Sequence, residues 1–454
     1  MKKKNQIMKS VISVLIPVCV LSCMFTGCYD TINNMNNHIN PDHYYLQEIE
    51  HLHVTDSPGK QSGFNQNSDS DLISKSDPGQ NSNPDSDSLE IRAVWLPVML
   101  YENWMKSETQ FRESIRDAFR NCQELGCNTI FVHVRAYCDA YYHSQIFPAG
   151  TFMNPEQDYD PLEIMLEEAH AVNLSIHAWI NPMRAQTAQK ITALDQKYIL
   201  RQWYDDPDKN GTYLVNFEGR YYLNPAYQEV RELIADGVQE ILENYDVDGI
   251  HMDDYFYPTT EPAFDQDAFT QSEFQDLAEF RRTNCSELVK LLYQTVKNQN
   301  PDVIFSISPQ GNFEINFNQL YADVKCWCSE AGYCDWIIPQ LYYGFENGTC
   351  PFREILGEWA EICTVPELVV GLAAYKIGTQ DQWAGSGKLE FLTNPAVISE
   401  ELEYLSEFSE SQTSQANPGI AGTALYSYSS LFEPEQAVSA LIAEEKSRIA
   451  ELWN

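Results

Sequence analysis

The chain is poor in basic residues. Its 454 residues include 29 Lys and Arg against 66 Asp and Glu, which gives a formal net charge of -37. Because the phosphates of a nucleic acid require a basic surface, this imbalance argues against a nucleic-acid partner. It also argues against electrostatic attachment to an anionic membrane surface. The hydrophobic content of 43% is that of a globular protein with a sizeable core, so the acidity belongs to the surface.

Paired metal-binding cysteines are also missing. Nine of the 12 cysteines lie between Cys122 and Cys363, and their spacings do not form the paired C-x-x-C framework of a zinc site. We expect mostly buried structural thiols, because the sequence offers no base or positive surroundings for a nucleophilic cysteine. Bridges from Cys326 or Cys328 to Cys334 are the alternative in an exported protein. The sequence therefore predicts no metal and no cofactor.

The hydrophobic run near the N-terminus is short for a membrane span. It covers Val11 to Val20, follows three consecutive lysines, and precedes Phe25-Thr-Gly-Cys28. This order predicts a signal peptide over residues 1–28 that ends in a bacterial lipobox, with a diacylglycerol on the Cys28 thiol. Cys23 is a competing lipidation site, and an uncleaved anchor is the alternative to cleavage. Either way, we expect an extracytoplasmic, membrane-anchored lipoprotein.

Residues 29–88 have too little apolar content for a folded domain. The segment is rich in Asn, Asp, Ser, Gly and Gln, as in Asn65-Gln-Asn-Ser-Asp-Ser-Asp71. Such a composition cannot bury enough apolar surface to fold, which predicts a disordered acidic tether. A flexible chain of about 60 residues has an r.m.s. span of about 45 Å, enough to hold a domain away from a membrane.

Residues 89–454 alternate short β-branched or aromatic runs with amphipathic helical stretches. Eight β-then-α units over about 365 residues predict an α/β protein, a (β/α)8 TIM barrel with long loops after some strands. A doubly wound sheet is the alternative, weakened because no Gly-rich phosphate loop follows the first strand. The predicted strands are 91–98, 129–136, 175–181, 249–255, 304–308, 336–341, 368–373 and 423–427. The predicted helices are 108–125, 161–172, 225–245, 285–298, 319–331, 352–363, 398–408 and 434–453.

The stretch Tyr245–Pro258 concentrates more chemistry than the rest of the chain, with four Asp, one His and three Tyr. A short buried strand is predicted to end beside Asp253 and Asp254, where α/β proteins build their active sites. Because side chains alternate along a strand, we expect Asp253 to point inward, on the face of His251. An Asp pair that only caps a loop is the simpler interpretation. The surrounding His and Tyr residues favour an active site.

Polar and aromatic residues recur where the other predicted strands end. Carboxylate, amide and guanidinium groups can bind sugar hydroxyls, and aromatic rings can stack on apolar sugar faces. Trp95 is the exception, since its early position in a strand favours core packing. His133 and Arg135 are predicted to share one face. The substrate-binding candidates from this pattern are His133, Arg135, Trp179, Asn181, Arg184, His251, Tyr255, Gln340 and Tyr342.

Glycoside hydrolysis requires two carboxyl groups, one protonated and one ionised. Asp253 or Asp254 can supply one of them. The candidates for the second are the other member of this pair, Asp139, Asp335 and Glu346. Asp139 follows a strand end and can approach the barrel mouth, whereas Asp335 precedes its strand and is expected at the far end. The predicted catalytic set is therefore Asp253, Asp254 and Asp139.

Residues 89–454 resemble the glycosyl hydrolase-like 10 family, also known as domain of unknown function 187. The resemblance is carried by Arg92-Ala-Val-Trp95, Phe131–Arg135, His177–Pro182, Tyr222–Pro225, Asn244–Pro258, Ile307-Ser-Pro309 and Pro339–Tyr342. Asn224, within one of these motifs, joins the substrate-binding candidates. The resemblance implies a TIM-barrel glycoside hydrolase on an envelope protein, an acidic residue matching Asp253 or Asp254, and a cell-wall glycan such as peptidoglycan strands without stem peptides. Ala136–Asp139 departs from the Pro-containing variant expected there.

Three functions remain open from the sequence. The first is an envelope-anchored glycoside hydrolase that acts on a cell-wall or extracellular polysaccharide. The second is a noncatalytic glycan-binding or scaffolding lipoprotein that lacks a competent acid pair. The third is a metal-dependent hydrolase that uses His251, Asp253 and His133, whose spacing matches no standard ligand motif.

Overall fold

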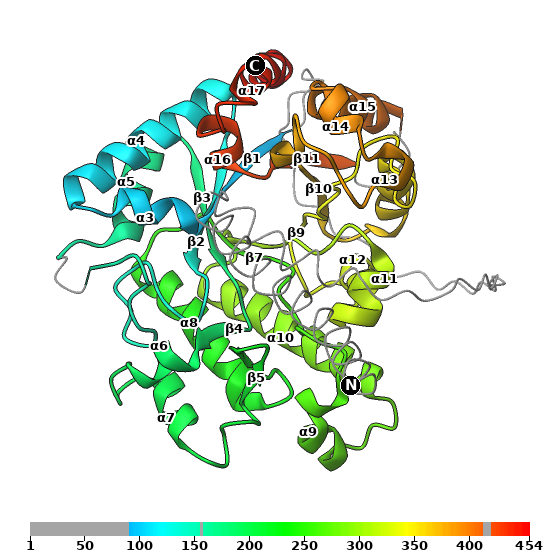
Figure 1. The fold of residues 1–454 in the computed structure, drawn as a ribbon. Coiled ribbons are helices and arrows are strands. Elements are labelled where there is room, and N and C mark those ends of the chain that lie inside the picture. The colour runs from blue at the N-terminus through cyan, green and yellow to red at the C-terminus, as the bar shows by residue number, and fades with distance from the viewer. Residues whose placement is uncertain (1–89, 155–157, 412–418) are drawn as a thin grey trace, which may run out of the picture. The chain divides into compact units, whose positions relative to one another are not determined.

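The computed structural model describes residues 90–154, 158–411 and 419–454. Eight parallel strands close into a barrel in the order β1-β11-β10-β9-β8-β7-β3-β2 (Figure 1), which confirms the predicted (β/α)8 architecture. All eight predicted strands are present, several of them shorter than expected. They are β1 (Ile91–Leu96), β2 (Thr129–Arg135), β3 (Ser175–Ile180), β7 (Gly249–Met252), β8 (Ile304–Ile307), β9 (Trp336–Ile337), β10 (Glu367–Leu372) and β11 (Ile420–Leu425).

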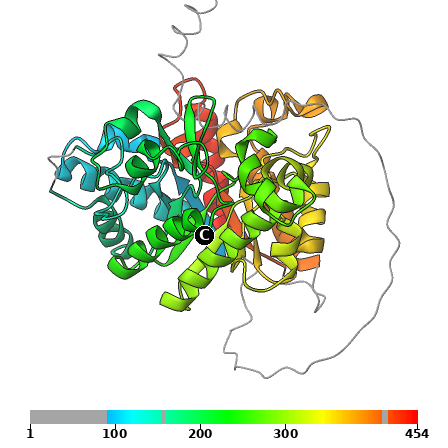
Figure 2. The same cartoon turned by 90° about the horizontal axis from the view of Figure 1, so that it is seen from below.

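Helices form the outer layer of the barrel (Figures 1 and 2), and each predicted helix has a counterpart. Parallel strands are covered on both faces in this arrangement, which explains why every residue of β2 is buried. The helices that follow the eight barrel strands are α4 (Glu108–Leu125), α5 (Pro161–His170), α8 (Gln228–Asn244), α10 (Leu277–Gln299), α12 (Val324–Ser329), α13 (Phe352–Ile362), α15 (Val397–Ser411) and α17 (Ser439–Trp453).

Local signals define the ends of these helices. Helix α4 begins after Ser107, whose side chain accepts a hydrogen bond from the Gln110 N–H, and ends at Gly126 with φ of 99°. A residue with a Cβ atom is strained in that left-handed conformation, so glycine suits the position. Helix α5 begins after Asp160, whose carboxylate accepts from two backbone N–H groups of the first turn.

The sequence did not predict the segment between β3 and α8. Here β4 (Arg184–Thr187), β5 (Leu214–Phe217) and β6 (Arg220–Leu223) form an antiparallel sheet in the order β4-β6-β5. Two short helices, α6 (Ala188–Thr192) and α7 (Ile199–Asp205), lie beside this sheet (Figure 1). Each strand has four residues, too few for a clear alternation of apolar and polar side chains. The insertion follows a barrel strand and so lies on the side of the barrel mouth.

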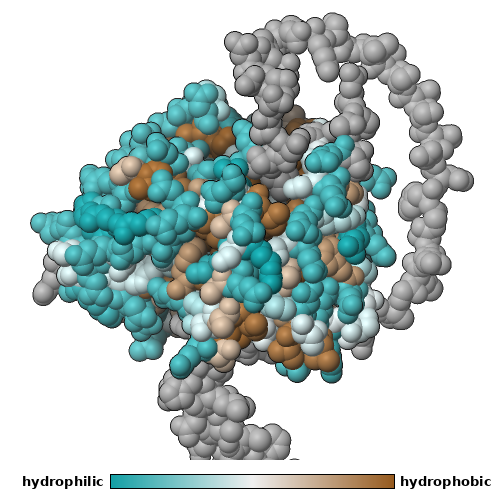
Figure 3. Space-filling model, turned by 90° about the horizontal axis from the view of Figure 1, so that it is seen from above, coloured by the Kyte–Doolittle hydropathy of each residue, from teal (hydrophilic) through white to brown (hydrophobic). Residues whose placement is uncertain are grey.

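Shorter elements occupy the loops after the other barrel strands. They are α3 (Tyr101–Trp104), α9 (Gln266–Gln271), α11 (Phe313–Ile315), α14 (Glu390–Thr393) and α16 (Tyr428–Phe432). The surface seen in Figure 3 is mostly hydrophilic, with separate hydrophobic patches, as the acidic composition predicts.

The predicted signal peptide, Cys28 and the tether lie outside the described residues. Among the helices that are described, none combines the length and apolar character needed to cross a bilayer. The nine cysteines from Cys122 to Cys363 are free thiols, and all but Cys326 are buried. The alternative bridges from Cys326 or Cys328 to Cys334 are not formed, and the prediction of buried structural thiols is confirmed.

Candidate active site

The candidate site begins where β7 ends. All four residues of β7 are buried, and the strand pairs with β3 and β8, which places His251 opposite Ser306. The next two residues, Asp253 and Asp254, are each 4% exposed. They lie at the carboxyl end of the barrel, where β/α barrels carry their active sites.

His251 lies inside the barrel with both ring nitrogens engaged. The indole Nε1–H of Trp95 donates to His251 Nε2 at 3.0 Å, so the imidazole proton lies on Nδ1. Nδ1 in turn donates to Ser306 Oγ at 2.9 Å. Burial lowers the pKa of His251 well below its ordinary value, which keeps the ring neutral. Trp95, which is 2% exposed, therefore belongs to the core, as its position predicted.

Asp253 is bound by a tryptophan of the neighbouring strand. Trp179 Nε1–H donates to Asp253 Oδ2 at 2.9 Å, and the backbone N–H of Tyr255 donates to Oδ1 at 3.3 Å. His133 stacks on Trp179 with ring centroids 3.8 Å apart, and burial lowers the pKa of His133 to about 3. These contacts confirm that Asp253 points inward. Trp179 is 1% exposed, so in this structure its indole holds a carboxylate and offers no open face.

Asp254 accepts hydrogen bonds from two neutral amides. Gln310 Nε2 donates to Asp254 Oδ2, and the Gln340 side chain also hydrogen-bonds the carboxylate. The two glutamines follow β8 and β9 and form a parallel bridge with each other. Burial raises the pKa of Asp254 more than these hydrogen bonds and the charge of Arg184 lower it. Tyr342 lies near the pair. Burial is the main cause that raises the pKa of Tyr342, and the neighbouring Tyr375 and the charges of both aspartates raise it further.

Arg135 does not share the surroundings of His133. The register between β2 and β3 shifts between these two residues, so the alternation of side chains breaks. The Arg135 guanidinium lies 4.3 Å from the Phe147 ring centroid and donates to the Pro182 carbonyl at 3.1 Å. The prediction of a shared face was therefore wrong, because the bulge turns Arg135 toward Phe147.

Asp139 is buried within its own loop. Its Oδ1 accepts from the backbone N–H groups of Ala136 and Tyr137, and Oδ2 accepts from Gln186 of β4 at 3.3 Å. Burial raises the pKa of this carboxyl group. Asp139 thus joins the loop after β2 to the unpredicted sheet, and Gln186 is a partner that the sequence analysis missed.

The other candidates for the second carboxylate lie elsewhere. Asp335 precedes β9, accepts from the Phe305 N–H and pairs with Lys297 at 2.7 Å, at the far end of the barrel as predicted. Glu346 lines a cavity of about 410 Å³ that also contains Arg353 and Tyr404. Neither Asp253 nor Asp254 lines this cavity, so it is separate from the aspartate pair.

The remaining substrate-binding candidates separate into two places. The Arg184 guanidinium lies 4.1 Å from the Tyr255 ring centroid, and Asn181 hydrogen-bonds His133. These three candidates, with His133, therefore lie around the aspartate pair. Asn224 instead donates to the Thr212 carbonyl at 3.0 Å and accepts from the Ala226 N–H at 3.1 Å, which ties the insertion to the start of α8.

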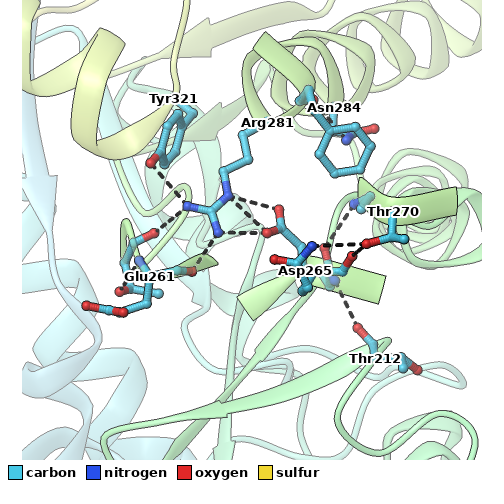
Figure 4. Close-up of polar contacts among 12 residues, drawn as sticks. Thr212, Glu261, Asp265, Thr270, Arg281, Asn284 and Tyr321 are labelled. Carbon is cyan, nitrogen blue, oxygen red and sulfur yellow. Dashed lines mark hydrogen bonds and ion pairs between the residues drawn. The ribbon is translucent and has the colours of Figure 1, made fainter. Parts of the chain in front are cut away.

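A buried ion pair anchors the loop that carries the two aspartates (Figure 4). Arg281 of α10 donates to both carboxylate oxygens of Asp265 at 2.7–3.1 Å, and both side chains are fully buried. The same guanidinium donates to the Thr259 and Glu261 carbonyls and to the Tyr321 hydroxyl. The sequence analysis missed this cluster because the predicted helix began after Arg281. An Asp and an Arg around a helix start give no distinct signal by themselves.

The geometry does not favour the metal-dependent alternative. Both nitrogens of His251 are engaged, and His133 is stacked against Trp179. Within residues 90–154, 158–411 and 419–454, no group of three or more His, Cys, Asp or Glu side chains is arranged to hold a metal ion.

Comparison with known proteins identifies the family of the chain. Residues 90–385 match the family model described as glycosyl hydrolase-like 10. Glycosyl hydrolase YngK of Bacillus subtilis (strain 168) is 31% identical over 321 residues, 63% of this chain and 61% of that protein, so the match spans less than two thirds of YngK. Glycosyl hydrolase DigH of Escherichia coli (strain K12) is 28% identical over 400 residues, 78% of this chain and 87% of that protein.

A solved structure supports the fold. The catalytic domain of β-amylase from Paenibacillus polymyxa aligns with a TM-score of 0.50 and 10% identity, over 81% of this chain and 99% of that one. A likeness at this sequence identity shows that the two chains share the barrel fold. It does not show that they share a function. The family model, by contrast, covers more than half of the sequence. The chain belongs to the glycosyl hydrolase-like 10 family.

Proposed function

We propose that this protein is an envelope-anchored glycoside hydrolase that cleaves a cell-wall or extracellular polysaccharide. The observation that carries the proposal is the pair of buried aspartates at the end of β7, whose surroundings differ. Two carboxyl groups in contrasting surroundings can divide the acid and base roles of glycoside hydrolysis. Membership of the family and the names of its relatives as glycosyl hydrolases support the same reaction class.

In this proposal Asp254 is the general acid. Burial raises its pKa, which favours a proton on the carboxyl group that can pass to the leaving glycosidic oxygen. Asp253 accepts two N–H hydrogen bonds, which suits an ionised carboxylate that attacks the anomeric carbon or activates a water. Asp139, also buried with a raised pKa, is the other candidate for the acid.

Substrate binding is assigned to the side chains around the pair. Tyr255, Gln340 and Tyr342 supply amide and hydroxyl groups for sugar hydroxyls, and the fully buried Asn181 and Arg184 position this cluster. A polysaccharide outside the cytoplasm fits the predicted lipid anchor at Cys28, and peptidoglycan glycan strands without stem peptides are the substrate to test first.

The test uses the full-length protein, purified in detergent, with peptidoglycan glycan strands that carry or lack stem peptides. Products are identified by mass spectrometry, and the variants Asp253→Asn, Asp254→Asn and Asp139→Asn are compared. We expect shortened strands that disappear with either of the first two variants. Bound glycan with no new reducing ends would contradict catalysis and support the noncatalytic scaffold. Loss of product only with Asp139→Asn would move the site to the loop after β2.

A further inference from the structure

Trp383 exposes a large aromatic surface near the barrel mouth. It lies in the segment between β10 and α15, which follows the carboxyl end of a barrel strand, and its side chain is 47% exposed. Leu389 and Leu392 of the same segment are also exposed. Single exposed apolar residues are common, so exposure alone identifies no site.

The backbone around Trp383 is held in place by buried contacts. The Trp383 N–H donates to Asp381 Oδ1 at 3.1 Å, and Asp381 pairs with Lys376 at 2.6 Å, with both side chains largely buried. The next residue, Ala384, accepts from the Gly348 N–H at 2.9 Å. The indole is therefore presented by a fixed turn packed on the loop that follows β9.

The same contacts join this turn to the aspartate pair. Lys376 Nζ also donates to the Tyr342 carbonyl at 2.8 Å, and Tyr342 lies close enough to Asp253 and Asp254 for their charges to raise its pKa. The Tyr375 ring meets the Tyr342 ring edge-on, with ring centroids 5.8 Å apart. Lys376 and Asp381 thus link the turn that carries Trp383 to Tyr342, beside the aspartate pair.

We propose that Trp383 is a sugar-stacking site for a distal unit of a polymeric glycan whose cleaved bond lies at the aspartate pair. Its occupant would be a pyranose ring, whose apolar face covers an indole while its hydroxyls remain in water. The proposal rests on the proposed function for the identity of the ligand. It predicts that Trp383 contributes to the binding of long chains and not of short fragments.

The test measures binding in the full-length Asp253→Asn background, where cleavage does not consume the ligand. The probes are peptidoglycan glycan strands without stem peptides, fractionated into four-sugar fragments and strands of more than ten sugars. Affinity electrophoresis in glycol chitin, xyloglucan, laminarin and amylopectin extends the search to other polymers. Trp383→Ala and Trp383→Phe are compared with Val365→Ala, an exposed apolar residue just before β10, at the opposite end of the barrel.

We expect Trp383→Ala to weaken binding of the long chain about tenfold, equivalent to about 1.4 kcal/mol. Trp383→Phe should lose less, and the four-sugar fragments and Val365→Ala should show no change. Trp383→Phe retains an aromatic ring and keeps the test valid if the alanine variant unfolds. Equal affinities of the Trp383 variants and their parent for long chains would overturn the proposal.

Separate readouts distinguish this proposal from the proposed function. Binding that depends on Trp383, without cleavage by the wild-type protein, would retain the stacking site and reject the hydrolase. Cleavage with a KM for long chains that is unchanged in Trp383→Ala would retain the hydrolase and reject the stacking site. No binding to any of the polymers would reject both.

Discussion

Asp265 and Asp254 are buried carboxylates of the same connecting segment, but their partners differ in kind. Asp265 faces the Arg281 guanidinium, whose remaining N–H groups bind two carbonyls and a hydroxyl (Figure 4). Asp254 faces the amides of Gln310 and Gln340, and burial raises its pKa. A cation donates directly to the first carboxylate, whereas the second accepts from neutral amides and Arg184 acts on it only through its charge.

This difference separates a carboxylate with an expected structural role from the carboxylate proposed as the acid. Breaking a buried ion pair leaves an uncompensated charge, so Asp265 and Arg281 are expected to contribute to stability. Burial raises the pKa of the Asp254 carboxyl group, a direction that suits proton transfer. Glu401 of α15 is a third case. It is 1% exposed, and neither carboxylate oxygen has a hydrogen-bond partner among the described residues.

The largest expected effect concerns activity. Asp254→Asn removes the proposed acid while keeping the shape of the side chain, and we expect turnover of an active glycan substrate to fall by about 10²–10⁴-fold. The free energy of unfolding should not fall, because the variant no longer buries an ionisable group. Steady-state rates and urea unfolding, with the exposed Asp267→Asn as control, check this separation. A variant with normal turnover would remove Asp254 from the mechanism.

The second effect concerns stability. Arg281→Met leaves the Asp265 carboxylate buried without its cation, and we expect a loss of about 3–5 kcal/mol in the free energy of unfolding. Urea denaturation measures the loss, and Arg282→Met at the neighbouring, partly exposed position is the control. Equal stability of the two variants would mean that the ion pair does not anchor the loop.

The third effect should be a gain in stability. Burial raises the pKa of Glu401 well above its ordinary value, and the neighbouring Glu390 adds to the shift. The folded-state pKa of Glu401 therefore lies above the unfolded-state value of about 4.3. The contribution of this carboxyl group to stability is fully present below the unfolded-state pKa and is lost as the pH rises through the folded-state pKa. Glu401→Met should therefore raise the free energy of unfolding by about 1–3 kcal/mol at pH 7.

Thermal unfolding of the wild type and Glu401→Met at pH 4 and pH 7 tests this sign. The gain should be smaller at pH 4, where the wild-type carboxyl group is protonated in the folded state and mostly protonated in the unfolded state. Glu401→Gln is the polar control. A variant less stable than the wild type at pH 7 would indicate that the carboxylate has a stabilising role.

The smallest effect is a shift in pH dependence. The Gln310 hydrogen bond favours the ionised form of Asp254, so Gln310→Leu should raise the pKa of Asp254 further. A general acid acts below its pKa, and the alkaline limb of kcat/KM should move up by about 0.5–1 pH unit, equivalent to about 0.7–1.4 kcal/mol. A limb that stays in place, or moves to lower pH, would show that another group supplies the proton.

Much of the fold followed from local patterns. Short apolar runs and amphipathic periodicity located all eight barrel strands and the helices between them, because these signals depend on neighbours along the chain. The sheet over residues 184–223 was missed, since its four-residue strands are defined by their pairing. The position of Arg135 was mispredicted because the bulge between His133 and Arg135 depends on the register with β3.

The sequence alone determined the order of the barrel elements and placed Asp253 and Asp254 at a strand end, because strand and helix periodicity are local properties. It could not assign different surroundings to these aspartates. Trp179 reaches Asp253 from β3, while Gln310 and Gln340 reach Asp254 from the ends of β8 and β9. Only the tertiary structure decided these partners, since burial and hydrogen bonding, which set the protonation of a carboxyl group, come from segments far apart in the chain.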